Sequence, residues 1–301
     1  MKIYDCIIVG AGPAGALCGY VIGKRGFSCL ILERLEEYGE KVCGGWLPNI
    51  ALCQLKQIGI DLNTIDFGIK TYSNITMHGK EKRIYTYPAG LYGLGTTRYD
   101  LDRYIAKSAI DVGTVIKFGK MVEKIELRDK VYHVSGYMGK NVVMATGARG
   151  FRGDFSELYK EQSFGISAQI CGTSILDNHC VYFWYESDEC KDYFWAIPIG
   201  INQWNIGFWC RFPNRDMLKK YNEGIKKYID NYFQNYHYIS KPKGAFLGNV
   251  NLGRAMKTEC FGVGDFSGKN SSDTGEGLRF AFKSAVETAN CIIEKLLLEK
   301  D

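Results

Sequence analysis

The hydrophobic pattern at the start of the chain predicts a strand, a helix and a second strand. Ile3 to Val9 form a short apolar run that is typical of a buried strand. A helical pattern follows from Pro13 to about Lys24, and the apolar run from Ser28 to Leu32 predicts the second strand. This order of elements is typical of a βαβ unit in a parallel sheet.

The pattern as far as residue 145 predicts further elements around this unit. Leu47 to Gln57 and Leu101 to Val112 have helical spacing, whereas Ile69 to Met77 and Arg83 to Pro88 alternate as strands do. Shorter apolar segments are interpreted as strands that return to the first sheet, namely Val115 to Phe118, Val122 to Leu127, Val131 to Gly136 and Val142 to Ala145.

A different pattern starts near Phe151. Residues 163–210 are dense in β-branched and aromatic residues, which favour strands. The predicted strands of an antiparallel sheet are Ser163 to Ile170, Cys180 to Tyr185, Tyr193 to Ile199 and Trp204 to Cys210.

The last third of the chain predicts two helices and a strand. A long amphipathic helix is predicted from Asn214 to His237. Its stripe of apolar and aromatic residues indicates packing in a core or, alternatively, a lid over an apolar ligand. Glu259 to Val263 predicts a buried strand, and Gly277 to Leu298 a closing helix. The residues of the stripe are Met217, Leu218, Tyr221, Ile225, Tyr228, Ile229, Tyr232, Phe233 and Tyr236.

A glycine motif joins the first strand to the first helix. Gly10, Gly12 and Gly15 form G-x-G-x-x-G, and Glu33 ends the second strand. Gly10 permits a tight turn, Gly12 lets a pyrophosphate approach the backbone, and Gly15 lets the helix pack on the strand. Free N–H groups at the helix N-terminus favour phosphate, and Glu33 can accept hydrogen bonds from ribose hydroxyls. The sequence therefore predicts a dinucleotide site rather than a plain glycine-rich turn.

Composition is that of an ordinary globular protein. The 301 residues, 46% of them hydrophobic, allow one large domain or two closely associated ones. The net charge of +5 is mild, and basic pairs such as Lys219-Lys220 indicate a solvated helix face, so no nucleic-acid partner is predicted. No apolar run reaches the roughly 18 residues of a membrane span, and the first residues are interpreted as a strand rather than a signal peptide.

The 11 cysteines are scattered along the chain. There is no C-x-x-C pair and no Cys/His cluster at metal spacing, so neither dithiol chemistry nor a metal site is predicted. Most fall on apolar faces, where a free cysteine behaves as a small hydrophobic residue. Reduced cysteines are typical of the cytoplasm, which is the predicted location.

Three further motifs carry candidate chemistry. Cys260 to Asp265 is an apolar strand that ends in Gly-Asp, and Gly275-Glu276-Gly277 follows it before the closing helix. Arg98 to Ile105 opens a helix in mid-chain. Tyr193-Phe194-Trp195-Ala196-Ile197-Pro198 is followed by Asn205-Ile206-Gly207-Phe208.

Together these motifs resemble those of the flavoproteins with the para-hydroxybenzoate hydroxylase fold, and within that group the geranylgeranyl reductase family. That family carries an aromatic-x-Trp-x-aliphatic-Pro motif, matched at Tyr193 to Pro198, and a Cys-Gly-Gly segment, matched at Cys43 to Gly45. The resemblance spans Ile3 to about Leu298 and implies FAD as the cofactor.

The resemblance also implies site residues. Glu33 would hold the adenosine ribose and Asp265 the ribityl chain, while Arg98 would contact FAD elsewhere. The predicted cofactor-binding residues are Gly10, Gly12, Pro13, Ala14, Gly15, Glu33, Arg34, Cys43, Gly44, Arg98, Ala145, Gly147, Gly264, Asp265, Gly275 and Gly277. The predicted substrate-contacting residues are Gly45, Trp46, Tyr193, Trp195 and Pro198.

The fold class implied is α/β, with a Rossmann-type FAD-binding domain interleaved with an antiparallel β-sheet substrate domain of α+β type. The predicted FAD-binding domain comprises residues 1–68, 97–150 and 250–301. The predicted substrate domain comprises residues 69–96 and 151–249.

The chain departs from the family pattern in two places. Thr146-Gly147 stands where the hydroxylases carry an Asp-Gly that supports FAD and nicotinamide binding, and no second G-x-G-x-x-G follows strand signals. An external electron donor is therefore expected: NAD(P)H, a flavin reductase or a ferredoxin. The family's C-terminal extension is also missing, from which a more open substrate cavity is expected.

Cys43 is the candidate catalytic residue. Because a cysteine thiol is mostly protonated at neutral pH, Cys43 could donate a proton or help to position substrate above the flavin. The alternative is a structural role, as a small residue where the backbone passes close to a ring.

The first functional hypothesis is an FAD-dependent oxidoreductase that reduces a carbon–carbon double bond of a small apolar, isoprenoid-like substrate by hydride transfer from flavin N5. The alternative is a flavin-dependent monooxygenase or halogenase that uses a C4a-(hydro)peroxyflavin, since halogenases share a Trp-x-Trp-x-Ile-Pro segment. A flavin-binding partner or sensor without enzymatic activity is the third hypothesis. An apolar substrate leaves peripheral contact with a membrane open.

Overall fold

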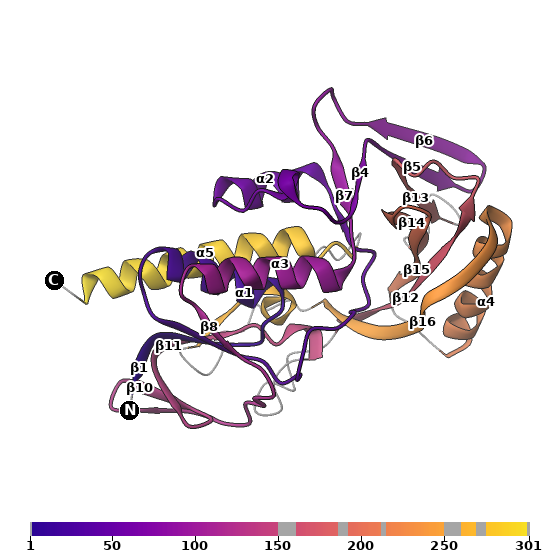
Figure 1. Cartoon of the computed structure of the whole chain (residues 1–301). Helices are drawn as coiled ribbons and strands as arrows, with labels where there is room; N and C mark the ends of the chain where they lie inside the picture. Colours follow the sequence, from indigo (N-terminus) through magenta and orange to yellow (C-terminus); the bar gives the residue numbers. More distant parts are fainter. Residues whose placement is uncertain are drawn as a thin grey trace.

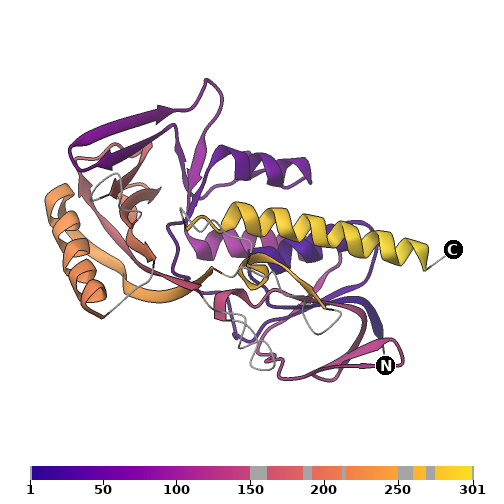
Figure 2. The ribbon, with the colours of Figure 1, turned by 180° about the vertical axis from the view of Figure 1, so that it is seen from behind.

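The computed structural model describes residues 2–149, 161–185, 192–211, 215–249, 260–268 and 275–299. Two large sheets lie side by side, one under helices α1, α3 and α5 and the other beside α4 (Figures 1 and 2). The helices are α1 (Pro13–Lys24), α2 (Asn49–Gln57), α3 (Arg98–Asp111), α4 (Arg215–Tyr232) and α5 (Leu278–Leu298), with short 3₁₀ turns at Leu62–Thr64, Gly147–Arg149 and Gly264–Ser267.

The first sheet has the strand order β8-β2-β1-β11-β10-β9, with β17 also paired to β11. The central β1 is parallel to both β2 and β11, whereas β10 and β9 are antiparallel. Burial on both faces explains the unbroken apolar runs that predict these strands. The strands are β1 (Ile3–Val9), β2 (Cys29–Leu32), β8 (Val115–Lys117), β9 (Ile125–Arg128), β10 (Val131–Val134), β11 (Tyr137–Met144) and β17 (Phe261–Gly262).

Helices α1, α3 and α5 cover one face of this sheet. Helix α1 contacts both α3 and α5, and its apolar residues join the main core with Ile8, Ile31 and Val143 of the strands. Residues on the opposite face of the same strands, including Ile7 and Met144, form a second core. The β1–α1 turn therefore follows directly on the buried end of β1, beside the fully buried β2.

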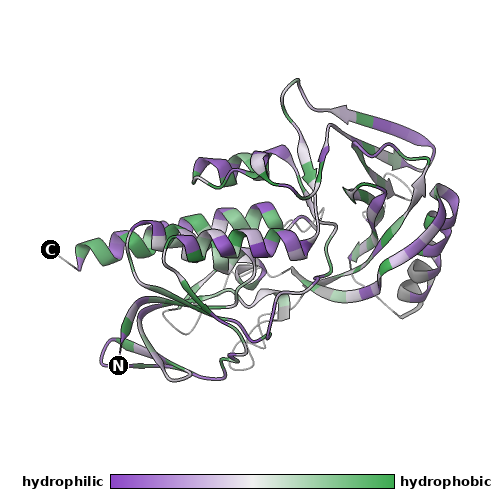
Figure 3. Cartoon of the chain, in the orientation of Figure 1, coloured by the Kyte–Doolittle hydropathy of each residue, from purple (hydrophilic) through white to green (hydrophobic). Residues whose placement is uncertain are grey.

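The second sheet has the order β16-β12-β15-β14-β13-β5-β6. The edge strand β6 is exposed along its length and mostly hydrophilic (Figure 3). The strands are β5 (Ser73–His78), β6 (Glu81–Thr86), β12 (Glu161–Ser174), β13 (Cys180–Tyr185), β14 (Tyr193–Gly200), β15 (Gln203–Arg211) and β16 (Phe233–Asn249).

The two faces of the second sheet pack against different partners. Phe194 and Phe208 share a core with Ile225 and Ile229 of α4. Trp195 alternates with Phe194 along β14, so it lies on the other face, in a separate cluster with Trp209. That second face is turned toward the nucleotide-binding side of the molecule.

A small sheet of β3 (Trp46–Leu47), β7 (Gly93–Gly95) and β4 (Ile69–Thr71) links the two regions. Strand β3 pairs with β7, so a segment assigned from sequence to the FAD-binding domain pairs with one assigned to the substrate domain. The predicted α/β fold class is confirmed, whereas the division into two domains at the stated residues stays a prediction.

Several predicted elements differ in the structure. The alternating segment predicted from Ile69 to Met77 is divided between β4 and β5, which belong to different sheets. The helix predicted to reach His237 ends at Tyr232, and β16 begins at Phe233, where pairing with Ser174 of β12 replaces the helical hydrogen bonds. The strand predicted from Val122 begins instead at Ile125. The core interpretation of the helical stripe is confirmed for Ile225 and Ile229, whereas the side chains of Met217, Leu218 and Tyr221 and the predicted element ends Asn214 and Glu259 lie outside the described residues.

Candidate functional site

The β1–α1 turn has the geometry that a pyrophosphate requires. Gly10 has φ +108°, and a Cβ there would lie 2.4 Å from the Ala145 carbonyl oxygen. A Cβ at Gly15 would lie 2.0 Å from the Gly10 oxygen. Pro13 opens α1, and no side chain caps the helix N-terminus after Gly12. The first N–H groups of α1 therefore face the turn without a side-chain acceptor.

Glu33 lies beside this turn. One carboxylate oxygen accepts a hydrogen bond from the Ala11 N–H at 2.8 Å, and the other from the Leu35 N–H at 3.0 Å. The carboxylate is thereby fixed with lone pairs left over for hydroxyl donors. Arg34, the next residue, is exposed.

A charge cluster centred on a buried aspartate lies close to the same turn. Asp102 of α3, whose side chain is 1% exposed, accepts hydrogen bonds from Arg98 at 3.0 and 3.1 Å and from Lys41 at 2.9 Å. Burial alone would raise the pKa of Asp102, but the two cations outweigh it and lower that pKa. Burial likewise opposes the charge of Arg98, yet Asp102 and the Cys43 thiol raise its pKa.

Lys41 and Asp102 were missed by sequence reasoning. The Lys41 Nζ lies 3.3 Å from where a Cβ at Gly12 would stand, so its charge is directly beside the predicted pyrophosphate position. The spacing of Asp102 four residues after Arg98 on a helix is a signal that could have revealed their pairing. The position of Lys41 in a loop gives no such signal.

The Gly264-Asp265 turn brings the C-terminal motif to the same place. A Cβ at Gly264 would lie 2.9 Å from the Ala14 Cβ, so this turn packs on α1. An Asp265 carboxylate oxygen lies 3.3 Å from where a Cβ at Gly277 would stand, just before α5. Burial raises the pKa of Asp265, and Arg98 and Lys41 oppose that shift.

Polar atoms without partners also mark this region. The Tyr38 hydroxyl and the Thr146 Oγ1 are buried and have no hydrogen-bond partner within the part of the chain that the structure describes. Ala145 and Gly147, which has φ +70°, flank Thr146 against the glycine turn. Backbone donors, two cations, Glu33 and Asp265 thus fit the phosphates and hydroxyls of FAD.

The Cys43-Gly44-Gly45 segment lies between the charge cluster and the second sheet. Gly45 has φ +72°, and a Cβ there would lie 2.0 Å from the Thr96 oxygen. A Cβ at Gly44 would lie 2.7 Å from Ile197. The Cys43 thiol accepts the Gly45 N–H at 3.4 Å, and Cys43 is near enough to Arg98 to contribute to the raised pKa of that guanidinium. Arg98 therefore joins the predicted FAD site to Cys43.

Aromatic side chains form the wall opposite this segment. The Tyr193 ring lies 6.1 Å from Trp195 and 5.5 Å from Trp209, and Trp46 contacts the wall through Phe183. Burial raises the pKa of Tyr193 well above its usual range.

Gly275 and Pro198, two residues predicted to belong to the site, have different surroundings. A Cβ at Gly275 would lie 2.6 Å from the Trp209 Nε1, which has no acceptor among the described residues. The pleat of β14 places Pro198 on the opposite face from Trp195, and the Pro198 carbonyl packs against Gly95. The predicted cofactor and substrate contacts of all these residues stay predictions.

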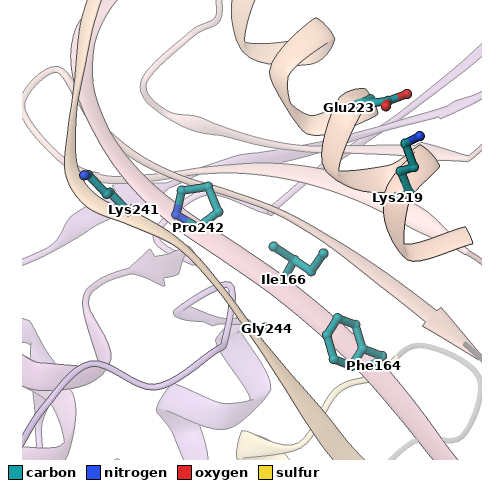
Figure 4. A pocket seen from close by; sticks show the side chains of 7 residues that line it. All are labelled: Phe164, Ile166, Lys219, Glu223, Lys241, Pro242 and Gly244. Carbon is teal, nitrogen blue, oxygen red and sulfur yellow. The ribbon is translucent and has the colours of Figure 1, made fainter. Parts of the chain in front are cut away.

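A cavity of about 700 Å³ lies beside α4. Lys219 and Glu223 of α4 border it together with Phe164, Ile166 and Lys241 (Figure 4). Phe164 and Ile166 point to the α4 face of β12. Gly165, which lies between them, faces the Cys43 side, because a Cβ placed on Gly165 would lie 3.3 Å from the Val42 side chain. This cavity is therefore on the opposite face of the sheet from the candidate site.

Among the described residues, no group of three His, Cys, Asp or Glu side chains could hold a metal ion. None of the described helices is long and apolar enough to cross a membrane.

Comparisons with known proteins agree with this geometry. A family model described as an FAD binding domain matches residues 4–137. Digeranylgeranylglycerophospholipid reductase of Methanococcus vannielii is 26% identical over 306 residues, covering 92% of this chain and 74% of the reductase.

Solved structures show the same fold. A geranylgeranyl bacteriochlorophyll reductase-like protein from Thermoplasma acidophilum matches with a TM-score of 0.83 at 19% identity, over 99% of this chain and 80% of that one. A flavin-dependent brominase matches with a TM-score of 0.76 at 18% identity, over 98% of this chain and 80% of that one.

The cradle for a dinucleotide, the matching FAD binding domain and the shared fold define a flavoprotein enzyme. This chain is an FAD-dependent oxidoreductase. Its relatives narrow the comparison further, since this chain is similar over most of its length to digeranylgeranylglycerophospholipid reductases.

Proposed function

We propose that this enzyme reduces a carbon–carbon double bond of an apolar substrate of the isoprenoid-lipid class. One observation carries the proposal: the Cys43 thiol accepts the Gly45 N–H, and a Cβ at the neighbouring Gly44 would lie 2.7 Å from Ile197 and 3.5 Å from the Trp195 Nε1. A thiol is thereby held at the junction between the FAD cradle and the aromatic wall. The relatives that are digeranylgeranyl lipid reductases support the choice of substrate class.

FAD, when bound and reduced by two electrons, would supply a hydride from its N5. In the proposal, the backbone of the glycine turn, Lys41 and Arg98 hold the phosphates, Glu33 the adenosine ribose and Asp265 the ribityl chain. The Cys43 thiol delivers the proton to the second carbon of the double bond, so that the substrate gains two hydrogen atoms in all. Tyr193 and Trp195 keep water away from that side.

The two electrons come from an external donor in this proposal. Thr146 stands in place of an acid, and its hydroxyl has no partner among the described residues. We expect free NADPH to reduce the bound flavin more slowly than about 1 s⁻¹, below ordinary turnover. Stopped-flow reduction under anaerobic conditions measures this rate. Rapid saturable reduction by NADPH would reject the expectation.

The test of the reaction is an anaerobic single turnover. Holoenzyme is reduced with dithionite, freed of excess reductant and mixed with a digeranylgeranyl glycerophospholipid. The account predicts that oxidised flavin returns in step with a lipid that has gained two hydrogen atoms, as mass spectrometry would show. A lipid left unchanged under these conditions contradicts it. A product that instead gains oxygen or halide when air and bromide are admitted would favour the monooxygenase or halogenase alternative, which the brominase fold supports.

A further inference from the structure

Asn205 connects the two motifs of the candidate substrate side. It lies on β15, its exposed fraction is 4%, and both ends of its side-chain amide are used. The Nδ2 donates to the Cys43 carbonyl oxygen at 2.9 Å, and the Oδ1 accepts from the Trp195 Nε1 at 2.8 Å. We propose that Asn205 is the positioning residue that sets where the Cys43 thiol stands. The inference rests on the proposed function for its catalytic consequence.

The two partners of Asn205 determine how its amide points. An indole N–H can only donate, and a carbonyl oxygen can only accept. The amide oxygen must therefore face Trp195 and the amide nitrogen must face Cys43. Aspartate would present a second acceptor to the Cys43 carbonyl, and a hydrophobic residue would leave both buried partners unpaired. Among the standard side chains of this size, asparagine alone satisfies both.

The surrounding glycines clamp the indole that Asn205 holds. A Cβ at Gly207 would lie 2.0 Å from the Trp195 Cζ2, so the ring lies directly on the backbone two residues after Asn205. A Cβ at Gly44 would lie 3.5 Å from the Trp195 Nε1 on the other side. The indole thus stands between the Cys43 segment and β15. The clamp gives a physical reason for an Asn-x-Gly after the Trp-x-Ile-Pro motif.

The far end of the same segment is held from the first region. The Gly45 carbonyl accepts from the Thr96 N–H at 2.8 Å, just before Arg98 begins α3. Cys43 is therefore held by the second sheet through Asn205 and by the start of α3 through Gly45. Residues 162 positions apart in sequence, Asn205 and Cys43, act as one unit.

The experiment compares how fast Cys43 is alkylated in FAD-loaded variants. Peptide mass mapping separates Cys43 from the exposed Cys53 and Cys291. We expect Asn205→Asp to change the Cys43 alkylation rate by about 3- to 10-fold, the scale of one lost hydrogen bond. Trp195→Phe should change it less, because the bond to the Cys43 carbonyl remains. It also serves as the second variant should Asn205→Asp fail to fold.

Asn141→Ala is the matched control. Asn141 is 1% exposed and also uses both ends of its amide, donating to the Asp5 carbonyl at 3.1 Å and accepting from Lys295 at 3.0 Å. It should lower thermal stability while leaving Cys43 alkylation as in the parent protein. If Asn205→Asp and Trp195→Phe both leave the alkylation rate of Cys43 at the parent value, the inference is wrong.

A second readout separates this inference from the proposed function. In a single turnover with the lipid, Asn205→Asp should slow flavin reoxidation by up to about 100-fold, the effect of a misplacement of about 1 Å. If the parent protein reduces no lipid, the proposed function fails, whereas the alkylation rates still decide the role of Asn205.

Discussion

The nucleotide cradle and the Cys43 region are built in different ways. The centre of the cradle is local: β1, the glycine turn, α1 and Glu33 come from one continuous stretch, and backbone geometry at Gly10 and Gly15 shapes the turn. Lys41, Arg98 and Asp265 join this centre from other segments. The Cys43 region is assembled from distant segments, which side-chain hydrogen bonds such as those of Asn205 hold together. A local, backbone-built site depends on few residues, whereas an assembled site fails wherever one of its connections is cut.

The largest expected effect comes from Asp102, because it serves both regions. Asp102→Asn leaves the buried Arg98 without its counter-charge, which should cost about 3–5 kcal/mol in the free energy of unfolding. Urea denaturation measures this loss, and FAD content and Cys43 alkylation should both change. Asp111→Asn is the control, since its pair with Lys107 is exposed and should cost less than about 1 kcal/mol. Equal losses in the two variants would contradict the assignment.

The same residue predicts a pH dependence. Burial raises the pKa of Asp102, but Arg98 and Lys41 lower it overall. A carboxyl with a lowered folded-state pKa contributes stability that is complete above its unfolded pKa of about 4 and is lost as pH falls through the folded pKa. The parent protein should therefore lose stability below about pH 4 more steeply than Asp102→Asn. Parallel stability curves would show that Asp102 carries no such linkage.

Cys43→Ser should affect the assembled region alone. If the thiol delivers the proton, the variant keeps FAD but slows single-turnover oxidation of the reduced enzyme by about 10²- to 10⁴-fold, the usual contribution of general acid catalysis. Cys53→Ser is the control, because Cys53 is exposed on α2. An unchanged rate with full FAD content would leave Cys43 a packing role only.

Glu33→Ala should affect the cradle alone, and its effect should be smaller than that of Cys43→Ser. Loss of charge-assisted hydrogen bonds costs about 1.5–3 kcal/mol, or about 10- to 150-fold in FAD affinity. Titration of flavin-free protein with FAD measures the change, and Glu37→Ala, an exposed acid nearby, is the control. A variant that purifies with full FAD and the parent affinity would exclude a ribose contact by Glu33.

The sequence predicted the cradle better than the assembled region for the same physical reason. Strand, glycine turn and acid lie within one stretch, so their spacing alone predicts the βαβ unit and brings Glu33 to the turn. Lys41 lies in a loop whose path depends on α3, and the role of Asn205 appears only when β15 meets the Cys43 segment. The end of α4 at Tyr232 was missed because its apolar spacing continues into a strand whose pairing with β12 is set by the tertiary fold.

One measurement tests most directly whether the cradle and the Cys43 region have separate roles. It is the single-turnover rate of reduced Glu33→Ala and of reduced Cys43→Ser with the lipid, each variant being saturated with FAD. The account predicts that saturated Glu33→Ala reacts at nearly the parent rate, since its defect lies in affinity. Saturated Cys43→Ser should remain about 10²- to 10⁴-fold slow, since its defect lies in proton delivery. The opposite pattern, with Glu33→Ala slow at saturation and Cys43→Ser at the parent rate, would contradict the separation of the cradle from the reacting side.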